Sequence, residues 1–326
     1  MLYRHLGKSG LQVSEIALGS WLTYDDTTAS QAEACIDRAY EHGVNFFDTA
    51  NIYAGGAAER VVGRSLAKYP RSSYVLSTKV HGRMGPGPND GGLSRKHIME
   101  QCDASLKRLG HDYVDLYFCH RFDPGTPIEE TLDALADLVR HGKIIYYAVS
   151  EWTAQQISDA TMITRQRSLY PIVANQPHYS MLARGIEREI IPVCEREGIG
   201  QVTFSSLAQG VLTGKYKPGQ PPPSGTRAAG SNQFLQTGVL DPWVHDQVHV
   251  DDALLERVQR LQPLAVEAGL TMAQLALAWC LRQNNVASVI TGASRPEQVD
   301  QNVAASGKKL STELLTQIDE VLRKTE

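Results

Sequence analysis

The chain has 326 residues, of which 42% are hydrophobic and 21% are charged, proportions that are ordinary for a globular protein. Its formal net charge of −4 gives no overall positive field of the kind that attracts nucleic acid or an anionic membrane. The five cysteines are scattered and form no CxxC pair, which argues against a disulfide framework or a zinc site.

The N-terminal residues contain no charged segment followed by an apolar one, as a secretion signal would. The apolar run at 272–279 is too short to span a membrane. We therefore expect a cytoplasmic protein that is not inserted in a membrane. No linker or break in composition divides the chain, so we expect residues 1–326 to form a single domain.

Short apolar segments alternate with amphipathic stretches along the chain. They predict strands at residues 14–20, 44–50, 74–80, 114–120, 144–150, 172–176, 201–207 and 288–294. Eight strand–helix units indicate parallel strands, and eight is the number that closes a (β/α)8 TIM barrel. The alternative is an open doubly wound sheet, but the first strand is not followed by the GxGxxG sequence typical of that fold.

Three segments depart from this repeat. Residues 2–13 predict an N-terminal β-hairpin that closes the bottom of the barrel. Residues 208–250 form a long stretch rich in Gly, Pro, Gln and Ser, and loops of this length in compact domains are often functional lids. Residues 311–326 predict an extra C-terminal helix on the outside of the barrel.

Four polar residues fall where predicted strands end. Asp48, Lys79 and His120 end the second, third and fourth strands, and Tyr53 lies in the loop after the second. Each residue taken singly has an ordinary alternative role. Asp48 would cap a turn, Tyr53 would pack in a loop and His120 would be structural. Lys79 is harder to explain in this way, because a buried lysine is rare unless it is paired. Because the carboxyl ends of barrel strands build the active site, their shared position predicts a catalytic group.

The chemistry of these four residues is mutually supportive. A tyrosine pKa of about 10 is too high for proton donation near neutrality, and the ammonium of Lys79 is expected to lower it. Asp48 would neutralise Lys79, and a neutral His120 would bind a carbonyl oxygen. The set suits protonation of a developing alkoxide and suits a metal ion poorly.

A second feature is a predicted anion site after the last strand. Residues 292–295 precede Pro296 at a helix N-terminus, where free backbone N–H groups bind phosphate. Lys215 and Arg227 would add positive charge from the long loop. The alternative for each of these two residues is an ordinary solvated surface charge.

Several blocks of sequence, in order, carry a resemblance to a known family. They are YRHLGKSGLQVSEIALGSW, NFFDTANIYAGGAAERVVGRSL, VLSTKV, SLKRLGHDYVDLYFCHRFDP, GKIIYYAVSEW, NQPHYSML, FSSLAQGVLTGKY and GASRPEQVDQN. Over nearly its whole length the chain resembles the aldo-keto reductase superfamily. It is most similar to the branch of the potassium-channel β subunits and bacterial glyceraldehyde-3-phosphate reductase-like proteins.

The resemblance implies a barrel that binds NADPH (or NADP⁺) without a Rossmann domain and uses Asp48, Tyr53, Lys79 and His120 as a catalytic tetrad. Hydride would pass from the nicotinamide to the carbonyl carbon, and Tyr53 would protonate the oxygen. The implied substrate pocket is Trp21, Tyr53, His120 and Trp152. The implied cofactor residues are Gly19, Ser20, Trp21, Asp48, Ser150, Asn175, Gln176, Phe204, Ser205, Leu207, Gln209, Gly210, Lys215, Arg227, Gly292, Ser294, Arg295, Gln298, Gln301 and Asn302.

These cofactor residues divide by the part of the dinucleotide that they would hold. Ser150, Asn175 and Gln176 would hold the carboxamide, and Phe204 would stack on the nicotinamide. The set from Ser205 to Arg227 would follow the pyrophosphate, and the set after the last strand would hold the adenosine and its 2′-phosphate. The chain departs from the family pattern at Glu151, where relatives often carry Arg or Asn, and at Gln301, where an acid is common.

We therefore expect an NADPH-dependent reductase of aldehydes or ketones. One alternative is a regulatory subunit of the channel β type, non-catalytic or slowly redox-sensing, since such subunits share the barrel and the tetrad. Another is a barrel hydrolase or isomerase, which leaves Lys79 and Tyr53 without roles. The expected partners are a small carbonyl substrate, for which a phosphorylated aldehyde would meet Arg83 or Arg121, and copies of the chain in a homo-oligomer, a tetramer or octamer by analogy. No nucleic acid or membrane partner is expected.

Overall fold

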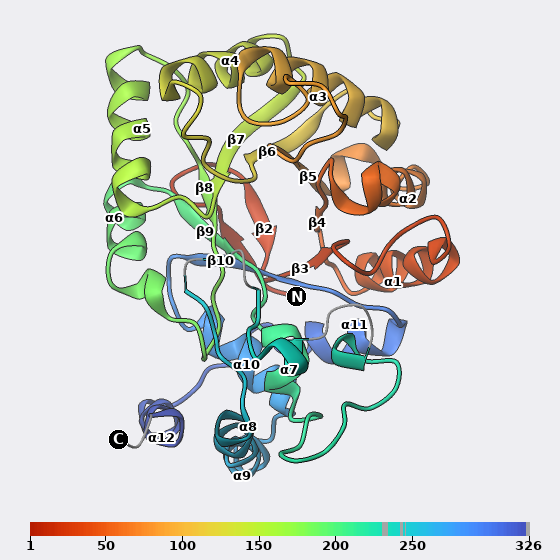
Figure 1. Ribbon diagram of the computed structural model, residues 1–326, viewed down its shortest axis with the longest axis vertical. Coiled ribbons are helices and arrows are strands. Elements are labelled where there is room, and N and C mark those ends of the chain that lie inside the picture. The colour runs from red at the N-terminus through yellow and green to blue at the C-terminus, as the bar shows by residue number, and fades with distance from the viewer. Residues whose placement is uncertain (230–233, 242–243, 245, 324–326) are drawn as a thin grey trace.

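Eight parallel strands close into a barrel with helices on its outside in the computed structural model, which describes residues 1–229, 234–241, 244 and 246–323 (Figure 1). The strands follow the order β10-β3-β4-β5-β6-β7-β8-β9 around the barrel. They are β3 (Ile16–Gly19), β4 (Phe46–Asp48), β5 (Val75–Val80), β6 (Val114–Cys119), β7 (Ile144–Ser150), β8 (Ala174–Gln176), β9 (Gly200–Thr203) and β10 (Val286–Thr291). The predicted TIM barrel is confirmed, and the open-sheet alternative is wrong.

Helices follow the strands and cover the barrel. They are α1 (Ala29–Glu41), α2 (Ala57–Leu66), α3 (Arg95–Leu109), α4 (Ile128–Arg140), α5 (Ala154–Gln166), α6 (Ile190–Glu197), α7 (Phe234–Thr237), α8 (Asp252–Gln259), α9 (Leu261–Glu267), α10 (Met272–Leu281), α11 (Pro296–Val303) and α12 (Thr312–Leu322). Short 3₁₀ helices occur at η1 (Tyr53–Gly56), η2 (Arg71–Ser73), η3 (Gly185–Glu187), η4 (Ala208–Thr213) and η5 (Arg227–Ala229).

The helix ends follow local sequence signals. Ser94 accepts a hydrogen bond from the backbone N–H of His97 at the start of α3, and the left-handed Gly110 ends that helix. Thr153 and Gln156 form a capping box at the start of α5. These caps fix where each helix begins and therefore how the preceding loop leaves its strand.

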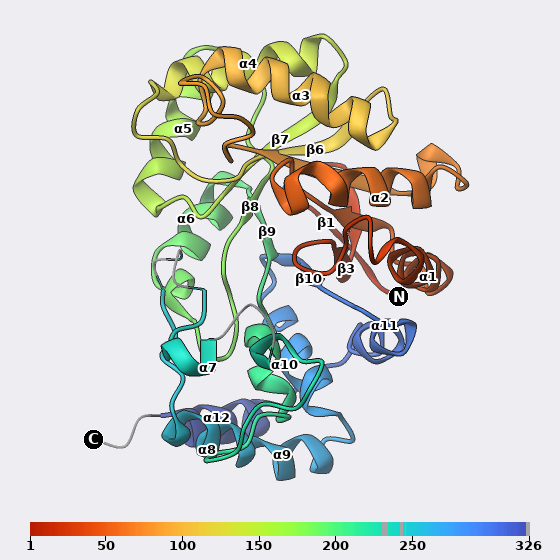
Figure 2. The ribbon, with the colours of Figure 1, turned by 45° about the vertical axis from the view of Figure 1, so that its right-hand side comes forward.

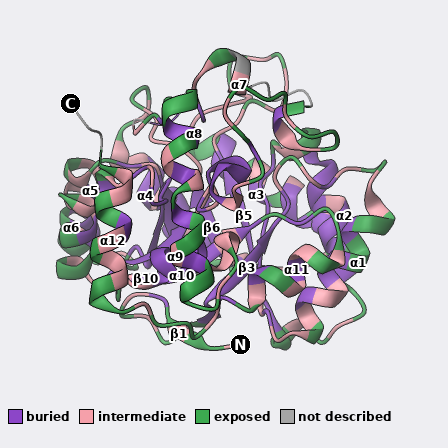
Figure 3. Ribbon diagram, turned by 90° about the horizontal axis from the view of Figure 1, so that it is seen from below, coloured by how far each residue is buried: buried purple, intermediate pink, exposed green. Residues whose placement is uncertain are grey.

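An N-terminal hairpin closes the barrel at the amino ends of the strands. Its strands β1 (Tyr3–His5) and β2 (Gln12–Ser14) pair antiparallel, as predicted. Leu6 and Val13 are fully buried among residues that fill the barrel interior, which Figure 3 shows as a buried centre of strands. The N–H of Lys8 donates to the carbonyl of Gly198 over 2.8 Å, which joins the hairpin to the barrel. The opposite end, at the carboxyl ends of the strands, is left for the site.

The outermost helices lie away from the strands. α12 packs on α8 and α9, so the C-terminal helix lies outside the barrel as predicted (Figure 2). That helix ends at Leu322, short of the predicted 326, and residues 324–326 lie outside the described part. The predicted long loop contains η4, η5 and α7, and its residues 230–233, 242–243 and 245 lie outside the described part as well.

Within the described residues, no single helix is long and apolar enough to cross a membrane. One pair of segments, 252–267 with 272–281, reaches the required length and composition only when joined across a bend of 86°.

Candidate active site

The four predicted catalytic residues lie at the carboxyl ends of three neighbouring strands, or in the loop after one of them, and meet at the carboxyl end of the barrel. Asp48 is the last residue of β4, Lys79 is next to last in β5, and His120 follows β6 directly. Tyr53 opens η1, five residues after Asp48. The backbone N–H of His120 donates to the carbonyl of Val80 over 2.8 Å, which continues the pairing of β5 with β6 past the strand ends. The structure therefore brings all four together.

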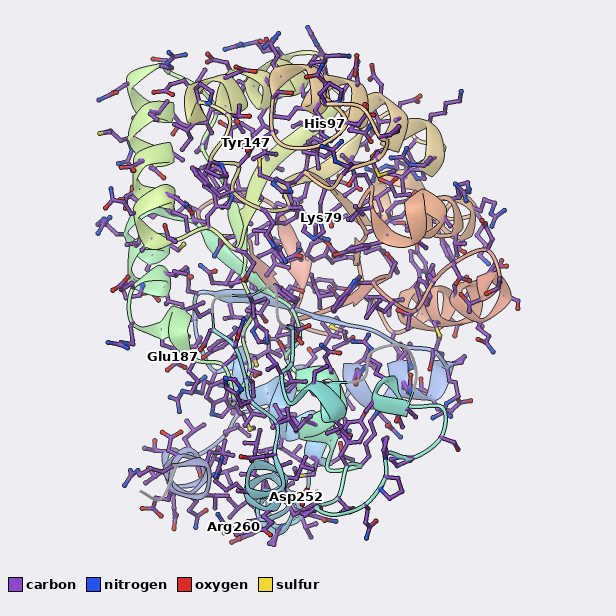
Figure 4. All side chains as sticks on the ribbon, viewed as in Figure 1. Lys79, His97, Tyr147, Glu187, Asp252 and Arg260 are labelled. Atoms are coloured by element: carbon purple, nitrogen blue, oxygen red, sulfur yellow. The ribbon has the colours of Figure 1, made fainter. Side chains whose placement is uncertain are left out.

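Lys79 and Asp48 form a buried ion pair. The Lys79 Nζ lies 2.5 Å from Asp48 Oδ2 and 2.7 Å from the carbonyl oxygen of Thr49, and the lysine side chain has no exposed surface. Figure 4 labels Lys79 inside the barrel, far from Asp252 and Arg260 on the outer helices. The other Asp48 oxygen, Oδ1, accepts hydrogen bonds from Ser77 Oγ at 2.6 Å and Gln176 Nε2 at 3.2 Å. Both charges are thus satisfied, as burial requires.

The ion pair decides the charge of Lys79. Burial acts to lower the pKa of its ammonium group, but the charges of Asp48 and Tyr53 outweigh burial, and the pKa lies above its ordinary value. Lys79 is therefore a cation at neutral pH.

Tyr53 lies between Lys79 and His120. The Lys79 Nζ is 4.9 Å from the centroid of the tyrosine ring. The Tyr53 hydroxyl is 3.4 Å from His120 Nε2, and the two rings meet edge to face, with centroids 5.6 Å apart. Ala54 has a φ of 48°, so the chain turns sharply just after the tyrosine. This turn sets the hydroxyl at the rim beside the imidazole.

The pKa of Tyr53 departs from the sequence expectation. Burial raises the pKa most, Lys79 lowers it and Asp48 raises it, and the net pKa lies above the ordinary value. The effect of Lys79 has the predicted sign, but the predicted net lowering is wrong in this structure because burial of the phenol outweighs one nearby cation. Tyr53 is consequently a neutral phenol and can act as a proton donor.

His120 is held neutral. Burial lowers the pKa of the imidazole well below its ordinary value, and the positive charges of Lys79 and Arg121, followed by His81, lower it further. A neutral imidazole carries one N–H and one acceptor nitrogen. At neutral pH it therefore hydrogen-bonds an oxygen without adding a charge to the site.

Beside the tetrad, the residues predicted for the nicotinamide lie at the ends of β7, β8 and β9. Asn175 is fully buried; its Nδ2 donates to Gln201 over 3.0 Å, and its Oδ1 has no hydrogen-bond partner. Ser150 Oγ donates to the backbone oxygen of Gln176 over 2.8 Å. Phe204 follows β9 and is half-buried. The unpaired Asn175 oxygen is an acceptor of the kind that a carboxamide NH₂ needs.

The predicted residues at the end of β3 and directly after it differ in how accessible they are. Gly19 packs against β10, since a Cβ there would lie 2.5 Å from the Ile290 side chain. Ser20 is buried and donates through its hydroxyl to Thr49 Oγ1 over 2.8 Å. Trp21 is half-buried. Of the three side-chain positions, Trp21 therefore offers the accessible surface.

Positive charge gathers at the other end of the predicted cofactor site. A Cβ on Gly210 would lie 2.7 Å from Lys215 Nζ, and one on Gly292 would lie 3.2 Å from Arg227 Nη2, so both glycines make room for a cation. Burial lowers the pKa of Lys215, and the charges of Arg227 and Arg295 lower it further. None of these three cations, which we call the cation cluster, forms an ion pair with a described residue.

The cation cluster fits a phosphate-bearing ligand, because Lys215, whose pKa is lowered by burial and by two neighbouring arginines, is stabilised in its charged form by a bound anion. Five of the residues predicted for the pyrophosphate lie close together in the chain. Gln209 and Gly210 are on η4, and Ser205, Leu207 and Lys215 lie within three residues of its ends. The residues present thus fit a nicotinamide dinucleotide at both of its ends.

Sequence reasoning missed Asp241. This buried residue of the long loop, with a φ of 36°, accepts hydrogen bonds from Ser205 Oγ at 2.7 Å and Gln209 Nε2 at 2.6 Å. Its charge also raises the pKa of Arg227, which burial lowers more strongly. The signal was present in the sequence, since Asp241 is the single acid between residues 208 and 245.

The residues predicted for the adenosine end lie on α11 and the turn before it. The backbone N–H of Ser294 donates to Gln298 Oε1 over 2.8 Å, which orders that turn. Asn302 is buried, whereas Gln301 is exposed. The backbone carbonyl oxygen of Gln301 accepts a hydrogen bond from Gln274 Nε2 over 3.3 Å. Gly292, Ser294 and Arg295 are exposed, so this end opens to solvent.

The remaining predicted pocket residue and the unusual Glu151 both lie after β7. Trp152 is 1% exposed and packs edge to face on Phe122, and its indole N–H has no hydrogen-bond partner. Glu151 has a φ of 58°, and its Oε1 accepts from the backbone N–H of His178 over 2.6 Å. Glu151 therefore ties the loop after β7 to the loop after β8.

No group of three or more His, Cys, Asp or Glu residues in the described ranges is placed to hold a metal ion. All five cysteines are buried and free of disulfide bonds.

Comparison with known proteins gives the family. The Aldo/keto reductase family matches residues 15–323. A probable voltage-gated potassium channel subunit beta from Arabidopsis thaliana is 45% identical over 309 residues, covering 94% of this chain and 91% of the relative. A protein of the same description from Oryza sativa subsp. japonica is 42% identical, with the same coverage. A putative voltage-gated potassium channel subunit beta from Schizosaccharomyces pombe is 40% identical over 331 residues, covering 99% and 94%. The chain belongs to the aldo/keto reductase family.

Proposed function

We propose that the chain reduces aldehydes or ketones to alcohols with NADPH. The observation that carries this proposal is the contact of a neutral phenol, Tyr53, with a neutral imidazole, His120, above the buried pair of Lys79 and Asp48. Membership of the family supports oxidoreduction more generally.

Each residue of the tetrad has a separate task. His120 hydrogen-bonds the carbonyl oxygen and orients it. The Tyr53 hydroxyl gives its proton to that oxygen as negative charge develops on it. Lys79 then stabilises the phenolate, and Asp48 holds Lys79 in place and in its charged form. When bound, NADPH supplies the hydride that reaches the carbonyl carbon.

Two features support the choice of cofactor. The unpaired oxygen of Asn175 lies where the nicotinamide carboxamide is expected, and the cation cluster lies where phosphates are expected. Arg295 is exposed at the start of α11, a suitable position for the 2′-phosphate that distinguishes NADPH from NADH.

The test is NADPH oxidation against a panel of aldehydes and ketones, with Tyr53→Phe beside the wild type. We expect Tyr53→Phe to lower kcat by about 100-fold or more, because it removes the proton donor. Tyr170→Phe is the matched control, since Tyr170 is an exposed tyrosine outside the site. Equal rates for Tyr53→Phe and the wild type on a good substrate would show that Tyr53 is not the donor.

A second candidate is a regulatory subunit, favoured by the names of the relatives, which are probable or putative channel β subunits. On that proposal the chain binds NADPH but turns over carbonyls slowly or not at all. Tight NADPH binding with no reduction across the panel would support it over the enzyme. We also propose a homo-oligomer, a tetramer or octamer, which light scattering on the purified protein tests.

A further inference from the structure

A cavity of about 430 Å³ lies among the outer helices, away from the site described above. It is walled by parts of α8 and α12, by residues 181–184 after β8 and by residues 247–249 of the long loop. In Figure 2, α8 and α12 lie together at the bottom of the view, apart from the barrel strands. No residue of the tetrad and none of the predicted cofactor residues lines this cavity. Its volume is in the range of small-molecule sites, about 300–1,000 Å³.

The walls of the cavity combine an apolar surface with positive charge. Met181, Leu254 and Leu322 are among the apolar side chains that line it. The charged side chains of the described lining are three arginines and one aspartate, namely Arg184, Arg257, Arg323 and Asp319. Apolar walls with a small number of charged groups are the usual composition of a site for a small molecule.

Arg184 and Asp319 are already paired with each other. Arg184 Nη1 donates to Asp319 Oδ1 over 2.7 Å, and its Nε and Nη2 donate to Glu187 Oε2 over 3.1 and 3.0 Å. The guanidinium also lies over the ring of Trp279, 5.0 Å from its centroid. These contacts neutralise the aspartate and fix Arg184 as part of the wall.

Arg257 and Arg323 have no such partners. Neither forms an ion pair with a residue that the structure describes. Arg257 is half-buried on α8, and its Nε is buried without a hydrogen-bond partner in the described part of the chain. A buried donor without an acceptor is destabilising, and few occur in folded proteins. An acceptor on a bound ligand would satisfy this donor.

We propose that the cavity binds a small amphipathic carboxylate of the medium-chain fatty acid class, with its carboxylate on Arg257 and its chain against the apolar walls. A planar guanidinium presents paired N–H donors that match the two oxygens of a carboxylate. Of the two unpaired arginines, Arg257 is half-buried and Arg323 is exposed, so the enclosed part of the site matches one negative charge rather than the roughly two of a phosphate monoester. Such a site is independent of the proposed reductase reaction.

Isothermal calorimetry on the full chain tests the site with octanoate, with 1-octanol, which lacks the carboxylate, and with acetate, which lacks the apolar chain. We expect octanoate to bind at least about 10-fold more tightly than either of the others. Arg257→Gln should raise the Kd for octanoate by about 10- to 100-fold, because charge-assisted hydrogen bonds are lost, and should leave the Kd for 1-octanol nearly unchanged. Arg260→Gln removes an exposed arginine that does not line the cavity, and as the matched control it should alter neither constant.

The apolar wall is tested separately by Leu322→Ser, at a half-buried position on α12. This variant should weaken the binding of octanoate and 1-octanol alike, and urea denaturation checks that each variant is folded. No binding of octanoate to the wild type at millimolar concentration, or an unchanged Kd in Arg257→Gln, would overturn the proposed site. NADPH oxidation by Arg257→Gln should match that of the wild type, because the cavity shares no residue with the tetrad or the predicted cofactor site.

Discussion

Lys79 and Asp48, 31 residues apart in the chain, meet inside the barrel with Nζ 2.5 Å from Oδ2 and almost no exposed surface on either side chain. A lone charge in such a place is costly, so each residue depends on the other. The pair lies beneath Tyr53 and sets the electrostatic conditions for the proton that this phenol carries.

The first prediction concerns that pair. Lys79→Met leaves Asp48 buried without its counter-charge, and we expect it to lower the free energy of unfolding by about 3–5 kcal/mol. Urea denaturation measures the change. Adding Asp48→Asn to Lys79→Met should recover part of the loss, because the uncompensated charge is then gone.

The matched control for stability is Lys96→Met, which breaks the exposed pair of Lys96 with Glu100 on α3. We expect a change within about 0.5 kcal/mol, since exposed ion pairs contribute little. Similar losses for Lys79→Met and Lys96→Met would contradict the special status of the buried pair.

A second prediction concerns pH and His120. The pKa of this imidazole is lower in the folded protein than in the unfolded chain, mainly because of burial, so the unfolded chain binds the extra proton first as pH falls. The stability that neutral His120 contributes is complete above the pKa of the unfolded chain, about 6.5. It is lost as the pH falls below that value toward the pKa of the folded protein. His120→Asn should therefore flatten the fall in stability below pH 6.5, by at most about 1.4 kcal/mol per pH unit.

Urea midpoints measured at several pH values test this. His81, His97 and His111 also have lowered pKa values, mainly from burial, so the comparison is between the slopes of variant and wild type. His141→Asn, at an exposed position, serves as the control. Parallel slopes for wild type and His120→Asn would count against a neutral His120 in the folded protein.

A third prediction concerns cofactor choice. Arg295→Ala should raise the Kd for NADPH by about 10-fold and leave the Kd for NADH nearly unchanged, because the 2′-phosphate is the group that differs. Quenching of protein fluorescence on titration measures both constants. Arg260→Ala removes an exposed arginine from the outer helices and should alter neither constant (Figure 4). An equal effect of Arg295→Ala on both cofactors would place Arg295 elsewhere.

A fourth prediction concerns the hairpin that closes the barrel. Gly7 has a φ of 58°, and a Cβ there would lie 2.3 Å from the carbonyl oxygen of Gly198. We expect Gly7→Ala to cost about 2–4 kcal/mol in thermal or urea denaturation, since both backbone strain and a clash with backbone oppose it. Gly10→Ala, in the same hairpin with nothing within 4 Å, should cost less than about 1 kcal/mol.

The sequence predicted the frame of the molecule because the frame depends on local patterns. Each of the eight barrel strands overlaps the apolar run that predicted it, and all except β9 and β10 lie within theirs. Since the carboxyl ends of parallel strands must share one rim, the convergence of Asp48, Lys79 and His120 followed from the fold alone.

What the sequence did not predict depends on contacts between distant residues. The hydrogen bond of Gln176 to Asp48 joins residues 128 positions apart, and the hold of Asp241 on Ser205 depends on the path of a long loop. The predicted shift of the Tyr53 pKa was wrong in its net direction, because the burial of the phenol has to be known before its effect can be compared with that of Lys79. Arg83 and Arg121 likewise became distinct only through the groups that accept their hydrogen bonds, the carbonyl oxygen of Gly87 for Arg83 and that of His120 for Arg121.

The hydrogen bond between Gln176 and Asp48 has a thermodynamic consequence. Gln176 touches Asp48, Asp48 touches Lys79, and Lys79 lies under the ring of Tyr53, so one continuous chain of contacts joins the end of β8 to the phenol. If a ligand that engages Gln176 changes the acidity of Tyr53, then protonation of Tyr53 must change the affinity for that ligand by the same factor. Protonation of Tyr53 and ligand binding at the barrel mouth would then be thermodynamically coupled.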